Sequence, residues 1–154
     1  MTIIVGLLCS EGVVIASDSQ AGYSRGVDRK RLDFTKIYDY AFDQANVVVT
    51  GAGMGPFITR AVEMLEEKSS SERFNKGRQI ADMAEAVMVE LHKKYVVDRQ
   101  KELGFMKARS GSHVPSKQDE WGGLGLALML GACCNKEFGI YTVYPGGIAD
   151  RAER

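Results

Sequence analysis

The sequence contains no apolar run that approaches the roughly 18 residues a helix needs to cross a bilayer, and its N-terminus lacks a basic region followed by a long apolar stretch. These absences argue against a membrane-spanning segment and a secretory signal peptide, so we expect a cytoplasmic protein. Charge of one sign is not in excess, because 20 Lys and Arg residues balance 20 Asp and Glu residues. Composition therefore gives no reason to expect binding to nucleic acid or to a membrane surface.

Cysteine is scarce and poorly spaced for chemistry. Cys9, Cys133 and Cys134 form no Cys-x-x-Cys pair and have no flanking histidine that would complete a metal site. We interpret them as buried strand residues, with a redox or metal-binding device as the alternative. No metal and no organic cofactor is expected.

The residues that are present are typical of a globular protein, with 45% hydrophobic and 26% charged side chains. A length of 154 residues fits one domain over residues 1–154 with a core of its own.

Hydrophobic periodicity and turn residues predict four strands, two helices and two further strands. β-branched and apolar runs favour strands at residues 3–9, 13–18, 36–40, 46–50, 124–134 and 138–144. Helical spacing of apolar residues favours helices at 56–68 and 77–103, with a loop at 104–123. Because consecutive strands precede the helices, we expect an α+β fold with antiparallel sheet, and the unbroken apolar runs indicate sheet covered on both faces.

Residues 22–31 are polar and rich in glycine and charge, which favours an exposed loop or hairpin tip. The run Arg29-Lys30-Arg31 within it is interpreted as part of a solvated hairpin, with a small patch for an anion or a partner as the alternative.

Thr2 carries the strongest chemical signal in the sequence. A methionine followed by a small residue is readily trimmed, and removal of Met1 would leave a threonine with both a hydroxyl nucleophile and a free α-amine base. The turn at residues 10–12 brings Asp18 back beside the N-terminus, and Lys36 opens the third strand at the same edge. A lysine ammonium held there would lower the pKa of the terminal amine by like-charge repulsion, which favours a neutral base near pH 7.

An acyl-transfer site also needs hydrogen-bond donors aimed at the developing oxyanion. Gly51 is the candidate, because it ends a strand just ahead of a helix and has no side chain to block its N–H. The neighbouring sheet edge suits an extended peptide that binds as an added strand.

The segments Thr2-Ile-Ile-Val-Gly, Asp18-Ser-Gln-Ala21, Lys36-Ile37 and Thr50-Gly-Ala-Gly53 resemble the opening of proteasome β-type subunits and of the bacterial HslV peptidase. Both are N-terminal-nucleophile hydrolases. The resemblance implies a four-layer αββα sandwich. It extends to about Gly147, and the C-terminal part of the family's domain is expected to be missing from this chain.

The resemblance also implies a role for each matching residue. It makes Thr2 the nucleophile, Asp18 and Lys36 its electrostatic support, and Gly51 the oxyanion donor. Substrate contacts fall to two groups: Gly22 and Gly53 at the substrate backbone, and Ala21, Phe34, Tyr38 and Val49 near the pocket for the residue before the scissile bond.

The function implied is that of a threonine endopeptidase subunit in a self-compartmentalised, ATP-dependent protease. Its partners would be a peptide or unfolded protein substrate, further copies of the chain in stacked rings, and a regulatory ATPase. Two alternatives stay open: a non-catalytic structural subunit of the same fold, and an amidase of the same superfamily that acts on a small molecule.

Overall fold

The structure, a computed structural model, describes residues 2–25, 28–33, 35–42, 45–98, 125–145 and 147–153. In chain order its elements are β1 (Ile4–Cys9), β2 (Gly12–Ser17), β3 (Gln20–Arg25), β4 (Asp28–Asp33), β5 (Ile37–Phe42), β6 (Ala45–Ala52), α1 (Gly55–Ser69), α2 (Gly77–His92), a π-helix (Lys93–Val97), β7 (Ala127–Cys134), β8 (Glu137–Tyr144) and β9 (Gly147–Glu153). The α+β class is confirmed.

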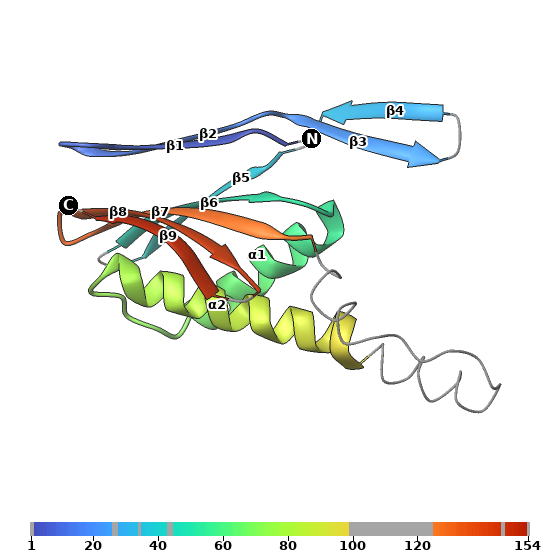
Figure 1. The fold of residues 1–154 in the computed structure, drawn as a ribbon. Coiled ribbons are helices and arrows are strands. Elements are labelled where there is room, and N and C mark those ends of the chain that lie inside the picture. The colour runs from blue at the N-terminus through green and yellow to red at the C-terminus, as the bar shows by residue number, and fades with distance from the viewer. Residues whose placement is uncertain are drawn as a thin grey trace.

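The described residues form three layers, which are a pair of helices, a large sheet and a small sheet (Figure 1). The large sheet has five antiparallel strands in the order β5-β6-β7-β8-β9, and α1 and α2 cover one of its faces. The β1–β2 hairpin lies over the other face, while β3 and β4 form a separate hairpin that projects beyond the body (Figure 1).

Two glycines allow the small sheet to approach the large one closely. A Cβ atom on Gly6 of β1 would lie 2.9 Å from the Met129 sulfur, and a Cβ atom on Gly131 of β7 would lie 2.7 Å from a Val13 methyl group. Both distances are shorter than an ordinary contact, so side chains at these positions would push the two sheets apart.

Three strands of the structure, β3, β4 and β9, have no counterpart among the predicted strands. Residues 22–31 are predicted as an exposed loop or hairpin tip, and the structure does form a hairpin there, but most of these residues belong to its two strands. The sequences of β4 and β9 are charged and lack apolar alternation, so no periodic signal marks them as strands. Both are held by backbone pairing with a neighbouring strand, which a local pattern does not reveal.

The second helix also departs from its predicted course. An α-helix continued through residue 95 would bury Tyr95, but the π-helical turn advances the buried position by one residue. Val96 is therefore buried and Tyr95 is exposed. The end of this predicted helix and the predicted loop 104–123 lie outside the described residues. None of the described helices is long and apolar enough to cross a membrane.

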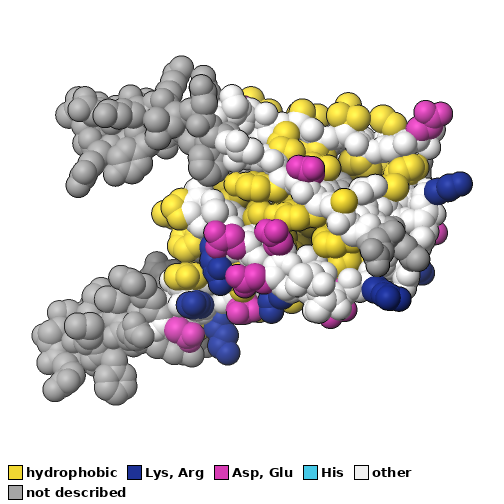
Figure 2. Space-filling view, turned by 180° about the vertical axis from the view of Figure 1, so that it is seen from behind, with side chains coloured by type: hydrophobic (Ala, Val, Ile, Leu, Met, Phe, Trp, Pro, Cys, Tyr) yellow, Lys and Arg dark blue, Asp and Glu magenta, His cyan; other side chains and the backbone are white. Residues whose placement is uncertain are grey.

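The main core lies between the helices and the large sheet. Its largest fully buried side chains are Met88, Leu91, Leu128, Leu130, Val49, Val87, Val143, Thr50 and Cys134. On the opposite side of the molecule, hydrophobic side chains gather along the top of Figure 2, over the small sheet.

These side chains belong to the outer face of β1 and β2. Val5, Leu7 and Val14 are 47%, 57% and 53% exposed. The expectation of cover on both faces is therefore wrong for this hairpin in the described part of the chain. The unbroken apolar run reflects one face packed on the large sheet and one face left open.

The three cysteines differ from one another. All lie in strands, but only Cys134 is buried, whereas Cys133 is half-buried and Cys9 is exposed. Cys9 occupies the outward-facing position at the end of β1, where no layer of the described structure covers it.

Candidate active site

The β1–β2 hairpin brings the start of the chain and Asp18 together. Its register pairs Ile4 with Ser17, so residues 3 and 18 are the next to meet. The Ile3 N–H donates to Oδ1 of Asp18 at 2.9 Å, and the Asp18 N–H donates to the Ile3 carbonyl oxygen at 3.1 Å. Asp18 therefore holds the backbone directly after Thr2.

Lys36 supplies the third segment of this arrangement. Its ammonium nitrogen lies 3.1 Å from Oδ2 of Asp18, which leaves one carboxylate oxygen on Lys36 and the other on the Ile3 N–H. Lys36 is only 7% exposed, and Asp18 is 28% exposed. A largely buried ammonium needs such a partner, because an unpaired charge is costly away from water.

Thr2 is half-buried and lies one residue before the Ile3 N–H that Asp18 binds. The sequence-based expectation that Asp18, Lys36 and the chain's beginning lie together is thus met in the geometry. The Asp18 carboxylate thus links the Lys36 ammonium to Ile3, the residue that follows Thr2.

Gly51 lies near the end of β6, where the antiparallel register with β5 closes at the pair Ile37–Thr50. The next residues along this register are Lys36 and Gly51. A Cβ atom at position 51 would lie 2.8 Å from a methyl group of Ile58, so the glycine also lets α1 pack tightly against the sheet. Packing alone thus accounts for glycine at this position.

Gly53 has a backbone requirement of its own. Its φ is +126°, and a side chain there would collide with the carbonyl oxygen of Gly125. Only glycine adopts this conformation without strain. The glycines at positions 51 and 53 therefore allow close packing against Ile58 and the backbone of Gly125.

The predicted pocket residues lie in different surroundings. Val49 and Tyr38 are directly opposite each other in the β5–β6 pair, with Val49 in the core and Tyr38 partly buried against it. Ala21 and Gly22 lie in β3, and Phe34 is outside the described residues. The substrate-binding roles of these residues stay predictions.

One contact of the candidate site is not predicted from the sequence, which is the hydrogen bond from the Ile3 N–H to Asp18. No side-chain pattern marks it, because the donor is backbone and its position depends on the hairpin register. Within the described ranges, no group of three or more His, Cys, Asp and Glu residues is placed to hold a metal ion.

Comparison with known proteins adds a family and several folds. The family model described as proteasome subunit matches residues 2–108. No curated protein matches the sequence. Three similar solved structures are an Anbu mutant from Hyphomicrobium sp. strain MC1 (TM-score 0.67, 14% identity), the helical assembly of the Anbu complex from Pseudomonas aeruginosa (TM-score 0.54, 16% identity) and eukaryotic HslV from Trypanosoma brucei (TM-score 0.50, 16% identity).

The alignments cover all of this chain but only part of each structure. The shares covered are 59% and 60% of the two Anbu chains and 71% of the HslV chain. The chain thus spans about three fifths of the length of the Anbu chains that it matches, and the shared part has the same fold.

Proposed function

Because this chain belongs to the proteasome subunit family, we propose that it is a threonine-type endopeptidase subunit of a self-compartmentalised protease. The observation that carries the proposal is the double contact of Asp18, which binds the Ile3 N–H through one oxygen and the Lys36 ammonium through the other. That contact links a buried positive charge to the residue that follows Thr2, whose hydroxyl and amine would do the chemistry.

In the proposed reaction, Thr2 begins the mature chain after loss of Met1. Its α-amine takes the hydroxyl proton, directly or through a water, while Oγ1 attacks the scissile carbonyl carbon. The tetrahedral intermediate collapses as the amine returns the proton to the leaving nitrogen. Water then hydrolyses the ester on Thr2, and the amine again acts as the base.

Lys36 and Asp18 have separate tasks in this scheme. The Lys36 ammonium would lower the pKa of the nearby terminal amine by like-charge repulsion, so that more of the amine is neutral near pH 7. Asp18 holds Lys36 in place and anchors the backbone after Thr2, which fixes the direction in which the N-terminus leaves β1.

Gly51 would donate its N–H to the oxyanion of the intermediate. Gly22 and Gly53 would bind the backbone of an extended substrate, and Ala21 would contribute to the pocket for the residue before the scissile bond. Val49 is buried in the core and would affect that pocket only through the residues that cover it. A substrate strand would bind at the two glycines through backbone hydrogen bonds alone, as in strand addition.

We propose stacked homo-oligomeric rings and a regulatory ATPase that delivers unfolded substrates, in the cytoplasm. The Anbu complex from Pseudomonas aeruginosa forms a helical assembly, which supports self-association of the fold. Enclosure of the active site in an assembly would restrict cleavage to unfolded chains that can enter.

Hydrolysis of a fluorogenic peptide by wild type and Thr2→Ala tests the proposal. We expect Thr2→Ala to abolish turnover, whereas Thr59→Ala should retain it, because the Thr59 hydroxyl only bonds the Gly55 carbonyl oxygen within α1. Intact-protein mass spectrometry of the same samples establishes whether Met1 has been removed. Mature wild-type protein that assembles but cleaves no peptide would show the structural-subunit alternative to be correct.

A covalent probe separates a peptidase from a small-molecule amidase. A peptide epoxyketone should label Thr2 with an efficiency that depends on the peptide sequence. Labelling that ignores the peptide portion would favour the amidase.

A further inference from the structure

A groove separate from the candidate active site runs beside β5, the edge strand of the large sheet. It has a volume of about 760 Å³ and lies between β5, the end of α1 and the segment that follows α1. None of Thr2, Asp18, Lys36 and Gly51 lines it. A cavity of this size can enclose several side chains of a bound molecule.

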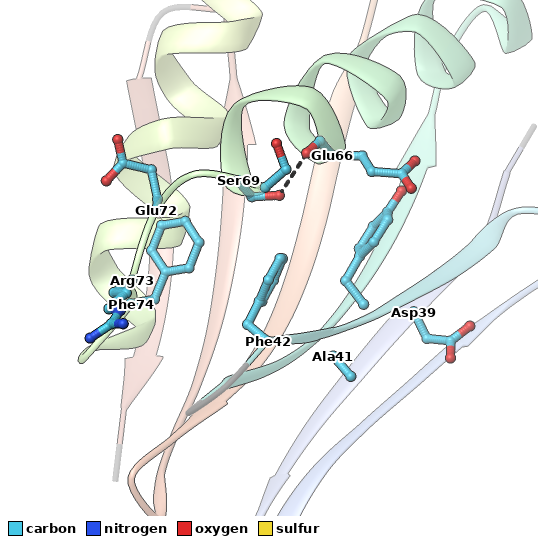
Figure 3. A pocket seen from close by; sticks show the side chains of 10 residues that line it. Asp39, Ala41, Phe42, Glu66, Ser69, Glu72, Arg73 and Phe74 are labelled. Atoms are coloured by element: carbon cyan, nitrogen blue, oxygen red, sulfur yellow. Dashed lines mark hydrogen bonds between the residues drawn. The ribbon is translucent and has the colours of Figure 1, made fainter.

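The groove follows the open edge of the sheet. β5 pairs only with β6 among the described strands, so no described strand lies at its second edge. Residues 39–42 line the groove in succession, although the side chains of a strand alternate between the two faces of its sheet. Figure 3 shows Phe42 pointing towards Ser69 on the helix side, whereas Asp39 points away from it. The groove is therefore lined from both faces of β5 and includes the edge between them.

The backbone at this edge suits an extended polypeptide. In an antiparallel ladder, every second residue of a strand directs its N–H and C=O away from the paired neighbour. An extended peptide laid along β5 would bind these groups and continue the sheet, and β5 offers six residues, Ile37–Phe42, for the pairing. A small ligand would use only part of the same edge.

The helix side of the groove has an aromatic base. The rings of Tyr40 and Phe42 are nearly parallel, with an interplanar angle of 18° and centroids 6.4 Å apart, and Phe42 meets Phe74 edge to face at 5.4 Å. Phe74 is buried, so this base is anchored in the core. Aromatic ring faces attract cations, and the planar guanidinium of arginine both stacks on a ring and binds a carboxylate.

The groove also carries an excess of negative charge. Its described lining includes Asp39, Glu66 and Glu72 against one cation, Arg73, and none of the three carboxylates forms an ion pair with another described residue. The negative charge extends to the aromatic base, because burial and the charge of Glu66 together raise the pKa of Tyr40 to about 12. Carboxylates without a partner beside ring faces favour a basic occupant.

We propose that β5 and this groove bind an extended, arginine-containing segment of a partner polypeptide, which adds as a strand to the free edge of the sheet. An arginine of the segment lies over the aromatic base with its guanidinium towards Glu66, and a basic residue on the other face of the sheet lies towards Asp39. Main-chain pairing holds the segment, and the arginine selects its sequence. The inference does not depend on the chemistry of Thr2.

Fluorescence anisotropy with a fluorescein-labelled synthetic peptide of alternating arginine and valine tests this binding. The whole chain is used as its Thr2→Ala variant, so that the probe is not cleaved. We expect saturable binding of the arginine peptide and none of a peptide with glutamate in place of arginine. The arginine peptide with all its backbone amides N-methylated keeps its charge but cannot pair as a strand, so it should bind at least about tenfold more weakly.

Variants of the groove locate the site. Glu66→Gln/Glu72→Gln removes two charges with little change of shape, and Tyr40→Leu removes one ring of the aromatic base. Each should raise the Kd of the arginine peptide at least about fivefold. The matched control Glu63→Gln/Glu90→Gln removes the same charge at exposed helix carboxylates outside the groove, and should leave the Kd within about twofold.

Circular dichroism shows whether each variant is folded. If Tyr40→Leu does not fold, Glu66→Gln/Glu72→Gln decides the question. The inference would be overturned by a wild-type groove that does not bind the arginine peptide, by an unchanged Kd in the folded glutamine variant, or by equal binding of the N-methylated peptide. Displacement of the peptide by an equal concentration of spermine would assign the groove to small polycations and would overturn it as well.

Discussion

Lys36 and Asp18 are joined by an ion pair of 3.1 Å that links the start of β5 to the end of the β1–β2 hairpin. The lysine is largely buried and the aspartate is partly buried, so solvent reaches the pair mainly at the aspartate. Its second carboxylate oxygen binds the Ile3 N–H. Asp18 therefore both neutralises the Lys36 ammonium and holds the backbone that follows Thr2, and mutation can separate the two contacts.

Asp18→Asn and Asp18→Ala should destabilise the protein to different extents. Asparagine can still accept the Ile3 hydrogen bond but leaves the buried ammonium without its counter-charge, whereas alanine loses both contacts. We expect Asp18→Ala to lower the free energy of unfolding by about 2–3 kcal/mol and Asp18→Asn by less, as measured by urea denaturation.

The exposed pair between Arg78 and Asp82 provides the control. Its atoms are 2.7 Å apart, but both side chains are more than two fifths exposed. Asp82→Asn should therefore change the free energy of unfolding by no more than about 0.5 kcal/mol. Equal effects of Asp82→Asn and Asp18→Ala would contradict the importance given to burial.

The Thr50 hydroxyl is buried and finds no hydrogen-bond partner among the described residues. Thr50→Val replaces it with a methyl group of similar size and removes an unsatisfied polar group. The substitution should raise the free energy of unfolding by about 1 kcal/mol, measured by thermal or urea denaturation. Thr59→Val is the comparison, because the Thr59 hydroxyl is bonded, and it should give no gain.

Tyr40 should make stability depend on pH in the alkaline range. Burial and the negative charge of Glu66 raise the pKa of Tyr40 from 10.0 to about 12. The folded state therefore keeps the phenol proton more tightly than the unfolded state. The resulting stabilisation is complete below about pH 10 and is lost as pH rises towards 12.

Ultraviolet titration of tyrosinate should show one late-ionising group that is absent in Tyr40→Phe. The free energy of unfolding of the wild type should also fall relative to that of Tyr40→Phe between pH 10 and pH 12. A wild-type titration curve that differs from that of Tyr40→Phe only below pH 10 would contradict the assignment.

The cysteines should react with a thiol reagent at well-separated rates. Cys9 is exposed, whereas Cys134 is buried and burial raises the pKa of its thiol. Because the thiolate is the reactive form, Cys134 should stay protected until the protein unfolds. Loss of the fast phase in Cys9→Ser, followed by mass spectrometry, checks this order; a fast phase that persists in that variant is the contrary result.

Local signals were enough to predict the arrangement around Asp18. The two apolar runs and the turn between them lie within residues 3–18, and a hairpin of fixed register returns its last residue to its first. Lys36 is predicted to lie at the same edge because it opens the next predicted strand. The roles proposed for Asp18, Lys36 and Gly51 rest on the chemistry of an N-terminal threonine and on the resemblance to proteasome β-type subunits.

Features that depend on distant pairing were not predictable in this way. β4 and β9 have charged sequences, and their strand structure comes from partners on neighbouring strands. The burial of Val96 depends on a π-helical turn that interrupts the regular helical period. The groove beside β5 combines residues from a strand, a helix and a connecting segment, so no single stretch of sequence marks it.

In the proposed mechanism, a positive charge at Lys36 activates the amine and hydroxyl of Thr2. Peptide hydrolysis by Lys36→Met tests it most directly, because methionine fills similar space without charge and folding can be checked by circular dichroism. With Met1 removed, kcat/KM should fall at least about 100-fold, while Lys68→Met, whose lysine forms an exposed pair with Glu90, should stay within about twofold of wild type. A folded Lys36→Met protein that hydrolyses peptide at a rate similar to wild type would show that Lys36 does not activate Thr2.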